Sequence, residues 1–240
     1  NSKHEMQENN ENEMNISLPD SNTDEPIIEP DNVVGDHQPR NGPADQGQHD
    51  EETNDLFVSN ELLSRVRWAL IPFVNGNTYG GVSGEMRVHA NAEEKKWGQQ
   101  VIGRDSKNWT TQLGENLVRD ILALKGENPR RPRRLKGYAP DWETDNAIWE
   151  VKTRSWTTSG TAGEKVYGTM YKYADISEIY GKPLKIVCVA YQEWELVNGT
   201  TKIFGTESVR QQKFLDLARI CDINYIKFRD ILPESIISRI

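Results

Sequence analysis

Two carboxylates and an amine lie close together between residues 138 and 152, in the segment YAPDWETDNAIWEVK. Asp141 precedes a group of turn-forming residues, and Glu150 and Lys152 follow it in an apolar stretch with the period of a strand. Side chains alternate across a strand, so Glu150 and Lys152 project from the same face. If the preceding segment pairs back as the first strand of a hairpin, Asp141 lies near that face and the three side chains share one cleft.

Such a cluster has the composition of a magnesium site that acts on phosphate esters. Two close carboxylates repel each other, so one takes up a proton unless a divalent cation compensates their charge. Magnesium prefers hard oxygen ligands, keeps several waters and suits sites that engage phosphates. The metal would stabilise charge on the phosphoryl oxygens and lower the pKa of a bound water, which Lys152 could orient or deprotonate. The alternative is a solvated hairpin in which Glu150 and Lys152 form a surface ion pair.

The spacing of Pro140, Asp141, Glu150 and Lys152 resembles the signature of the PD-(D/E)XK superfamily, the restriction-endonuclease-like nucleases, over roughly residues 109–196. This resemblance implies an α/β fold with a mixed β-sheet flanked by helices, and Mg²⁺-dependent cleavage of DNA. It makes Asp141 and Glu150 metal ligands and Lys152 the residue that activates water, so all three are expected to be catalytic. Only eight residues separate Asp141 from Glu150, which requires a tight hairpin.

The resemblance also assigns roles to residues outside the signature. Members of the superfamily often carry a further acid on a preceding helix, and Glu115 fits this position as an auxiliary metal ligand. The alternative is that Glu115 stabilises the N-terminal end of its helix, by about 0.3 to 1 kcal/mol. Gln192, at the end of a later strand, matches a glutamine that faces the site in some relatives. Lys165 could contact the scissile strand.

Five cations precede the signature in the segment NPRRPRRLKGY, residues 128–138. Its prolines prevent a helix. Arginine binds phosphate oxygens bidentately, and such contacts supply position and affinity but no choice of sequence. We therefore expect DNA binding here; a solvated loop, or a nuclear-import signal in a eukaryotic cell, is the alternative. The five cations are Arg130, Arg131, Arg133, Arg134 and Lys136.

The first 60 residues differ sharply in charge from the rest of the chain. They hold fifteen Asp and Glu against Lys3 and Arg40, a net charge of −13; the whole chain carries −8, which leaves +5 for residues 61–240. A polar, acidic segment with few large apolar residues cannot offset the entropy of ordering. We expect an acidic disordered tail at residues 1–57 and the nuclease domain at residues 58–240. The tail could be a solubilising spacer or an internal mimic of nucleic acid.

Hydropathy and cysteine content indicate an intracellular protein. No run approaches the roughly 18 apolar residues of a membrane span, and no secretory signal is recognised. We expect a cytoplasmic location, or a nuclear one in a eukaryotic cell, and no membrane. Cys188 and Cys221 lie in apolar patterns and are expected to be small core residues with reduced thiols.

Periodicity and turn signals predict the elements that position these residues. The helix that opens the domain, within residues 59–74, should end before Pro72, and residues 75–105 should form loops and short strands. In the helix at 207–220 the apolar side consists of Val209, Phe214, Leu217 and Ile220. Further helices are expected at residues 108–125 and 173–180, strands at 147–152, 184–191 and 223–228, a Gly-rich loop after 153, and a hairpin at 195–204 around Asn198-Gly199.

Taken together, these features predict a magnesium-dependent endonuclease that acts on double-stranded DNA, most like a type II restriction enzyme. Such enzymes often dimerise, so the resemblance implies a homodimer as one arrangement. A repair or junction-resolving nuclease, which recognises DNA structure, is the alternative within the enzyme class. Outside it, the chain could be a non-catalytic DNA-binding protein with the same fold, or an interaction protein whose acidic tail recruits a partner.

Overall fold

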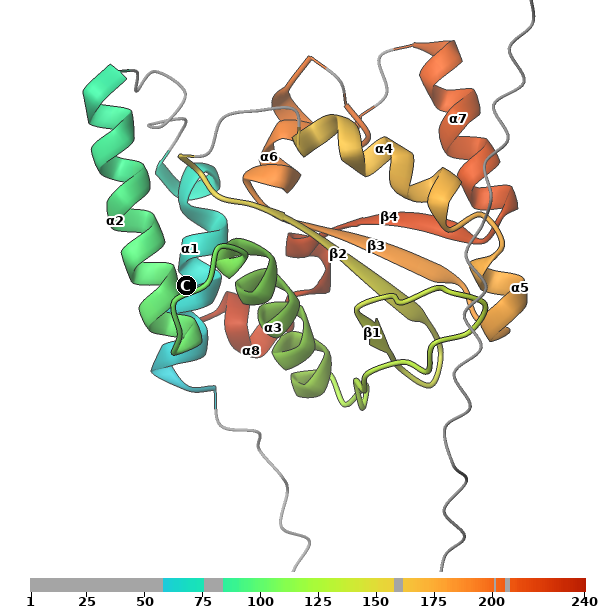
Figure 1. Ribbon diagram of the computed structural model, residues 1–240, viewed down its shortest axis with the longest axis horizontal. Coiled ribbons are helices and arrows are strands. Elements are labelled where there is room, and N and C mark those ends of the chain that lie inside the picture. The colour runs from blue at the N-terminus through green and yellow to red at the C-terminus, as the bar shows by residue number, and fades with distance from the viewer. Residues whose placement is uncertain (1–57, 76–83, 158–161, 201, 206–207) are drawn as a thin grey trace, which may run out of the picture. The chain divides into compact units, whose positions relative to one another are not determined.

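A four-stranded mixed β-sheet lies at the centre of the computed structural model, and helices pack against both of its faces (Figure 1). The strand order is β1-β2-β3-β4; β1 is antiparallel to β2, and β2, β3 and β4 are parallel. The structure describes residues 58–75, 84–157, 162–200, 202–205 and 208–240. The predicted acidic tail, residues 1–57, lies outside these residues. The predicted α/β class and the mixed sheet flanked by helices are confirmed.

Helices and strands follow one another along the chain in an irregular order. The elements are α1 (Asn60–Asn75), α2 (Gly84–Ile102), α3 (Trp109–Leu124), β1 (Trp142–Glu143), β2 (Ile148–Arg154), α4 (Ala162–Lys172), α5 (Ile176–Tyr180), β3 (Leu184–Ala190), α6 (Tyr191–Asn198), α7 (Val209–Ile220), β4 (Ile223–Lys227), the 3₁₀ helix η1 (Phe228–Ile231) and α8 (Glu234–Ile237). None of the described helices is both long and apolar enough to cross a bilayer.

The alternation of side chains in β2 divides the core into two layers. Trp149 and Val151 pack in one cluster with α1 and α3, whereas Ile148 packs on the opposite face with the region of α5. Glu150 and Lys152 share the face of Ile148, because they are separated from it by even numbers of residues. Figure 1 shows the same division, with α1 and α3 on one side of the sheet and α4 and α7 on the other.

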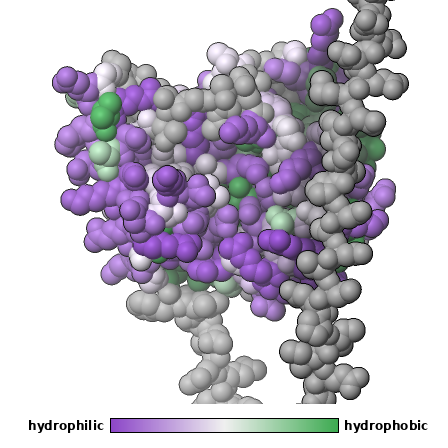
Figure 2. Space-filling view, in the orientation of Figure 1, coloured by the Kyte–Doolittle hydropathy of each residue, from purple (hydrophilic) through white to green (hydrophobic). Residues whose placement is uncertain are grey.

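The elements around the signature form as predicted. The hairpin of β1 and β2, the helix α3, the buried strand β3 and the strand β4 all lie at the expected positions. Residues 128–138 contain no helix, as their prolines require. Hydrophilic side chains cover most of the surface on the side that Figure 2 shows. Of the two cysteines, Cys188 is buried and Cys221 only half-buried, and both are free thiols.

Four predictions about other elements are wrong. Helix α1 continues through Pro72 instead of ending before it. Residues 84–102 form the helix α2, where Gly98 allows the ring of Trp109 to pack against the helix backbone. Helix α4 occupies part of the expected Gly-rich loop. The Asn198-Gly199 pair ends helix α6 and does not turn a hairpin, because this pair is a helix stop signal as well as a turn signal.

The helix α7 forms where expected, but its apolar side is reversed. Leu215 and Ala218 are buried against the sheet, whereas the four residues of the predicted apolar side are exposed. Ser208 caps the helix by accepting a hydrogen bond from the amide of Gln211, so the start of α7 is well defined. The periodicity therefore identified the helix correctly and assigned the wrong face to the core.

Candidate functional site

The hairpin of β1 and β2 brings Asp141 directly against the signature strand. The Asp141 amide donates to the carbonyl of Trp149 at 3.1 Å, and the Val151 amide donates to Asp141 Oδ2 at 2.7 Å. In the hairpin Trp142 pairs with Trp149, so continuing the register by one residue sets Asp141 opposite Glu150. Asp141 thus uses its main chain and its side chain to extend the pairing of β1 by one residue before its first strand residue, Trp142.

Glu150 and Lys152 lie side by side, as the alternation of the strand predicts. The Lys152 ammonium donates to Glu150 Oε1 at 2.6 Å, and the side chain of Glu150 is only 6 % exposed. The second carboxylate oxygen of Glu150 accepts a hydrogen bond from the hydroxyl of Tyr173, at 3.1 Å. Tyr173 is fully buried between α4 and α5. Both oxygens of Glu150 are therefore held by side chains from the same face of the sheet.

Asp141 experiences a strongly unfavourable environment for a charge. Burial, followed by the charge of Glu150, raises the pKa of Asp141 from 3.8 to about 7. The Val151 amide and the Lys152 ammonium act in the opposite direction, and the charge of Glu115 adds to the increase. Lys152 alone therefore does not compensate the two acids, which is the condition under which a carboxylate pair attracts a cation or a proton.

Helix α3 places Glu115 in a cavity that Asp141 also lines. An added Cβ on Gly114 would lie 1.7 Å from Thr153 Oγ1, so only glycine lets α3 approach β2 this closely. The neighbouring Glu115 is bonded by Arg131, whose Nη2 lies 3.2 Å from Oε2. A cavity of about 430 Å³ opens here, and its lining includes Glu115, Arg131 and Asp141.

Arg131 lines this cavity and is oriented by contacts with three other residues. Its Nη1 donates to the carbonyl of Asp141 at 3.1 Å, and its guanidinium lies 4.1 Å from the centre of the Trp142 ring. The Trp142 indole donates to the carbonyl of Glu115 at 2.9 Å. Through these contacts the basic segment, the hairpin and α3 are joined around the carboxylates.

Other predicted DNA-binding cations have different surroundings. Arg130 forms ion pairs with Glu143 at 3.0 Å and with Asp145 at 2.8 Å, so its guanidinium is engaged within the hairpin. Arg134 lines the cavity beside Asp141. The remaining predicted cations are exposed: Arg133 and Lys136 in the basic segment, and Lys165 on α4.

Gln192 lies in the first turn of α6, away from the carboxylates. Its amide nitrogen is 3.5 Å from Glu195 Oε2, and the same oxygen is bound by Arg154 at 2.6 Å. Arg154 projects from the same face of β2 as Lys152, two residues further on. Gln192 therefore belongs to a buried cluster at the end of the strand and makes no hydrogen bond to Glu150 or Lys152 among the described residues.

Three residues of this region escaped the sequence analysis. Tyr173 was expected only as the start of a short helix, Arg154 received no role, and Gly114 was read as part of a helix. Tyrosine at this distance in sequence gives no signal of its contact with Glu150. The glycine within a strongly apolar helix is the one local sign of a close approach that the sequence offered.

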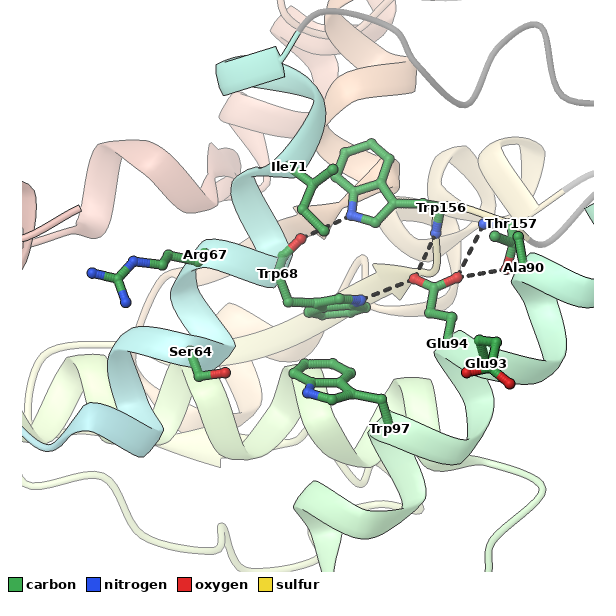
Figure 3. Close-up of a pocket in the computed structure, with 10 residues that line it drawn as sticks. All are labelled: Ser64, Arg67, Trp68, Ile71, Ala90, Glu93, Glu94, Trp97, Trp156 and Thr157. Carbon is green, nitrogen blue, oxygen red and sulfur yellow. Dashed lines mark hydrogen bonds between the residues drawn. The ribbon is translucent and has the colours of Figure 1, made fainter.

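A second cavity, of about 470 Å³, lies between α1, α2 and the residues that follow β2 (Figure 3). Glu94 crosses it and accepts hydrogen bonds from the Trp68 indole, the Trp156 and Thr157 amides, and the Thr157 hydroxyl, at 2.9, 3.1, 3.1 and 2.5 Å. Its four acceptor positions are thus filled by the protein. We interpret Glu94 as the residue that joins α2 to α1 and β2, and we assign this cavity no ligand.

Comparisons with protein families, curated proteins and solved structures found no match to this chain. Within the described part of the chain, no group of three or more His, Cys, Asp or Glu has the geometry to hold a metal ion. The candidate site therefore rests on the pair Asp141 and Glu150, with Lys152 beside them and Glu115 across the cavity.

Substituting Gly114 tests whether the close approach of α3 positions this site. Gly114→Ala should destabilise the fold by about 1 to 3 kcal/mol, because the added methyl group overlaps Thr153. Gly168→Ala in α4 is the matched control: an added Cβ there meets nothing within 4 Å, so its stability should stay equal or rise by up to about 1 kcal/mol. Urea unfolding measures both. Equal stabilities for the two variants would contradict the assigned packing.

The ionisation of Asp141 should make the stability of the metal-free protein depend on pH. Its folded pKa, about 7, lies above its ordinary value of 3.8, so the folded carboxyl holds its proton more tightly than the unfolded one. This contribution to stability is complete below about pH 4, is lost between about pH 4 and 7, and changes by at most about 1.4 kcal/mol per pH unit. Asp141→Asn should be more stable than the natural protein at pH 8.

Urea unfolding of both proteins in a chelator, at pH 5 to 8, measures this dependence. The difference between variant and natural protein should increase with pH up to about 7 and then level off. A difference that stays constant over this interval would show that Asp141 ionises normally in the fold.

Proposed function

We propose that the protein is a magnesium-dependent nuclease that hydrolyses phosphodiester bonds of double-stranded DNA, a restriction-endonuclease-like enzyme of the PD-(D/E)XK type. One observation carries the proposal: Asp141 lies opposite Glu150 in the hairpin, and Lys152 lies 2.6 Å from Glu150 on the same face. This is the arrangement that the signature requires of its three residues. The four-stranded mixed sheet with helices on both faces is compatible with it.

The donor set suits a hard divalent cation. Asp141 and Glu150 supply adjacent carboxylate oxygens, and the raised pKa of Asp141 reflects its burial and then the charge of Glu150. Glu115 could contribute across the cavity once Arg131 releases it, since the two are bonded at 3.2 Å. When bound, Mg²⁺ would neutralise the acids, stabilise charge on the phosphoryl oxygens and acidify a water.

Each residue of the site then has its own role in the proposed hydrolysis. Lys152, whose side chain is 27 % exposed, can reach a water at the cleft and orient it through a hydrogen bond from Nζ. As the neutral amine, once its ammonium has released a proton to solvent, Nζ can take the proton of that water. Glu150 holds this amine in place through the contact of 2.6 Å. Arg131 and Arg134 line the cavity and can bind the phosphates on either side of the scissile bond.

Incubation of plasmid with the purified protein and magnesium tests the proposed reaction. The natural chain should cleave the DNA, and a chelator or the variant Asp141→Ala should abolish cleavage. Lys152→Ala should keep DNA binding yet lose roughly 10²-fold or more in rate, as expected for the loss of a general base. Lys96→Ala, an exposed lysine on α2, is the matched control and should retain full activity.

The structure of the preferred DNA substrate distinguishes a restriction enzyme from a repair or junction-resolving nuclease. Discrete plasmid fragments would support a type II restriction enzyme, and a preference for flap or junction substrates over plain duplex would support a repair or junction-resolving enzyme. Full activity of Lys152→Ala would remove this residue from the mechanism. DNA binding without cleavage under every metal condition would favour the non-catalytic binding protein.

The buried hydroxyl of Tyr173 should position Glu150 for the cation. Burial and the adjacent Glu150 raise the pKa of Tyr173, so the hydroxyl keeps its proton and donates a hydrogen bond to the carboxylate. Tyr173→Phe should therefore weaken binding of Mn²⁺, measured by calorimetry without DNA, by roughly 3- to 10-fold. Tyr225→Phe is the control, because the Tyr225 hydroxyl donates to the Val166 carbonyl at 3.1 Å and not to Glu150. Equal Mn²⁺ affinities of the two variants would exclude the positioning role.

A further inference from the structure

A second amine lies close to Glu150, in addition to that of Lys152. Lys172 is the last residue of α4, on the side of the sheet that carries Glu150 (Figure 1). Its Nζ donates a hydrogen bond to the hydroxyl oxygen of Tyr173 at 3.0 Å, and this hydroxyl donates in turn to Glu150 Oε2 at 3.1 Å. One hydroxyl group therefore separates the Lys172 ammonium from the carboxylate.

The buried ring of Tyr173 determines where the Lys172 ammonium lies. Nζ is 4.5 Å from the centre of the ring, so a cation–π contact adds to the hydrogen bond. Burial, followed by the charge of Glu150, raises the pKa of Tyr173, and the charge of Asp141 adds to the increase. The hydroxyl that holds Lys172 is therefore close to both acids of the candidate site.

The Lys172 ammonium keeps donors for a substrate. A lysine ammonium has three N–H donors and no acceptor. Within the described part of the chain, its hydrogen bond to Tyr173 is the only one that it makes. The side chain of Lys172 is exposed, so a bound phosphodiester can reach the remaining donors without displacing a helix.

The two amines are held at different oxygens of Glu150. Lys152 is bonded to Oε1 at 2.6 Å, whereas Tyr173, which holds Lys172, is bonded to Oε2. In phosphoryl transfer the attacking and leaving oxygens lie roughly in line, on opposite sides of the phosphorus. A phosphodiester held next to Glu150 can therefore have Lys152 beside the attacking water and Lys172 beside the leaving oxygen.

We propose that Lys172 is the general acid that protonates the leaving oxygen of the phosphodiester, an inference that rests on the proposed nuclease function. The water oxygen forms a bond to phosphorus and gives one proton to the neutral amine of Lys152. The bond between phosphorus and the leaving oxygen breaks, its electron pair stays on that oxygen, and the Lys172 ammonium supplies the proton. Solvent then returns a proton to Lys172 and removes one from Lys152.

Replacing the leaving oxygen by sulfur isolates the step that needs an acid. An alcohol resembles water, whose pKa is about 16, whereas a thiol has a pKa of about 8.5. A thiolate therefore leaves without a proton, and an alkoxide does not leave readily unless it is protonated. Two DNA substrates of the same sequence, with oxygen or sulfur at the leaving position of the cut bond, measure the contribution of the acid.

Single-turnover cleavage of these substrates in Mg²⁺ tests the proposal, once the product ends of the natural protein show which bridging oxygen leaves. Lys172→Gln should cut the oxygen substrate at least about 10²-fold more slowly than the natural protein. It should cut the sulfur substrate within about threefold of the natural rate, because the thiolate needs no proton. Lys172→Arg should behave in the same way, because a guanidinium keeps the charge but does not give up its proton.

Binding and charge are controlled separately. In a chelator, Lys172→Arg should bind DNA as tightly as the natural protein, measured by fluorescence anisotropy, because the positive charge is retained. Lys165→Gln removes a predicted DNA contact on the same helix and should change both cleavage rates by the same factor. Lys96→Gln on α2 should leave both rates at the natural value. All three lysines are exposed, and circular dichroism should show an intact fold for each variant.

Equal losses of Lys172→Gln on the two substrates would overturn the role of Lys172 as an acid, as would a natural rate on the oxygen substrate. Natural activity of Lys172→Arg on the oxygen substrate would do the same, since the charge alone would then suffice. A natural protein that cuts the oxygen substrate but not the sulfur one would assign the leaving atom to a hard cation and also overturn the proposal. A natural protein that cuts neither substrate would reject the nuclease function itself.

Discussion

The placement of two acids opposite each other in one buried hairpin is the constraint on which this structure depends. Like charges at opposite positions of paired strands destabilise a sheet. Here Asp141 faces Glu150, and the charge of Glu150 contributes to the raised pKa of Asp141. The protein counters the repulsion with the Val151 amide, the Lys152 ammonium and the Tyr173 hydroxyl. Val151 and Lys152 lie on β2 itself, and the packing of the segment between α4 and α5 brings Tyr173 against this strand.

The packing of the surrounding elements restricts the movement of these donors. Tyr173 is fixed by its burial in the cluster around Ile148 and Ile186, so its hydroxyl has little freedom. Gly114 lets α3 lie directly against β2, and the next residue, Glu115, lines a cavity together with Asp141. The close approach of α3 also joins the first helical layer to the strand that carries the candidate catalytic residues.

The sequence predicted the parts of the site that depend on local spacing. Alternation in the strand placed Glu150 and Lys152 on one face, and the turn formers after Asp141 indicated the hairpin that returns it to them. Tyr173 escaped prediction because it lies 23 residues from Glu150 and meets it only through the packing of α4 against the sheet. Contacts of this kind are decided by the tertiary fold, and a single sequence carries no local sign of them.

The wrong predictions for α7 and for Asn198-Gly199 also arise because tertiary packing decides between alternatives that the local sequence leaves open. The apolar residues of α7 have helical spacing, but spacing alone does not say which of two sides meets the sheet. Only two residues, Leu215 and Ala218, form the buried side, and the four larger apolar residues on the other side outweigh them in the periodicity. In the same way, Asn198-Gly199 is compatible with a hairpin turn and with a helix end, and the burial of Leu196 on α6 decides for the helix.

The three candidate catalytic residues and the basic segment differ in how they are attached to the fold. Glu150 and Lys152 belong to one central strand, where the pitch of the backbone fixes their separation. The cations of residues 128–138 lie in an irregular connection between α3 and β1. Insertions or substitutions in that connection can therefore alter the number and placement of its cations while the separation of Glu150 and Lys152 stays the same. Under the proposed function, such a division would let one scaffold acquire new targets without a change in its catalytic residues.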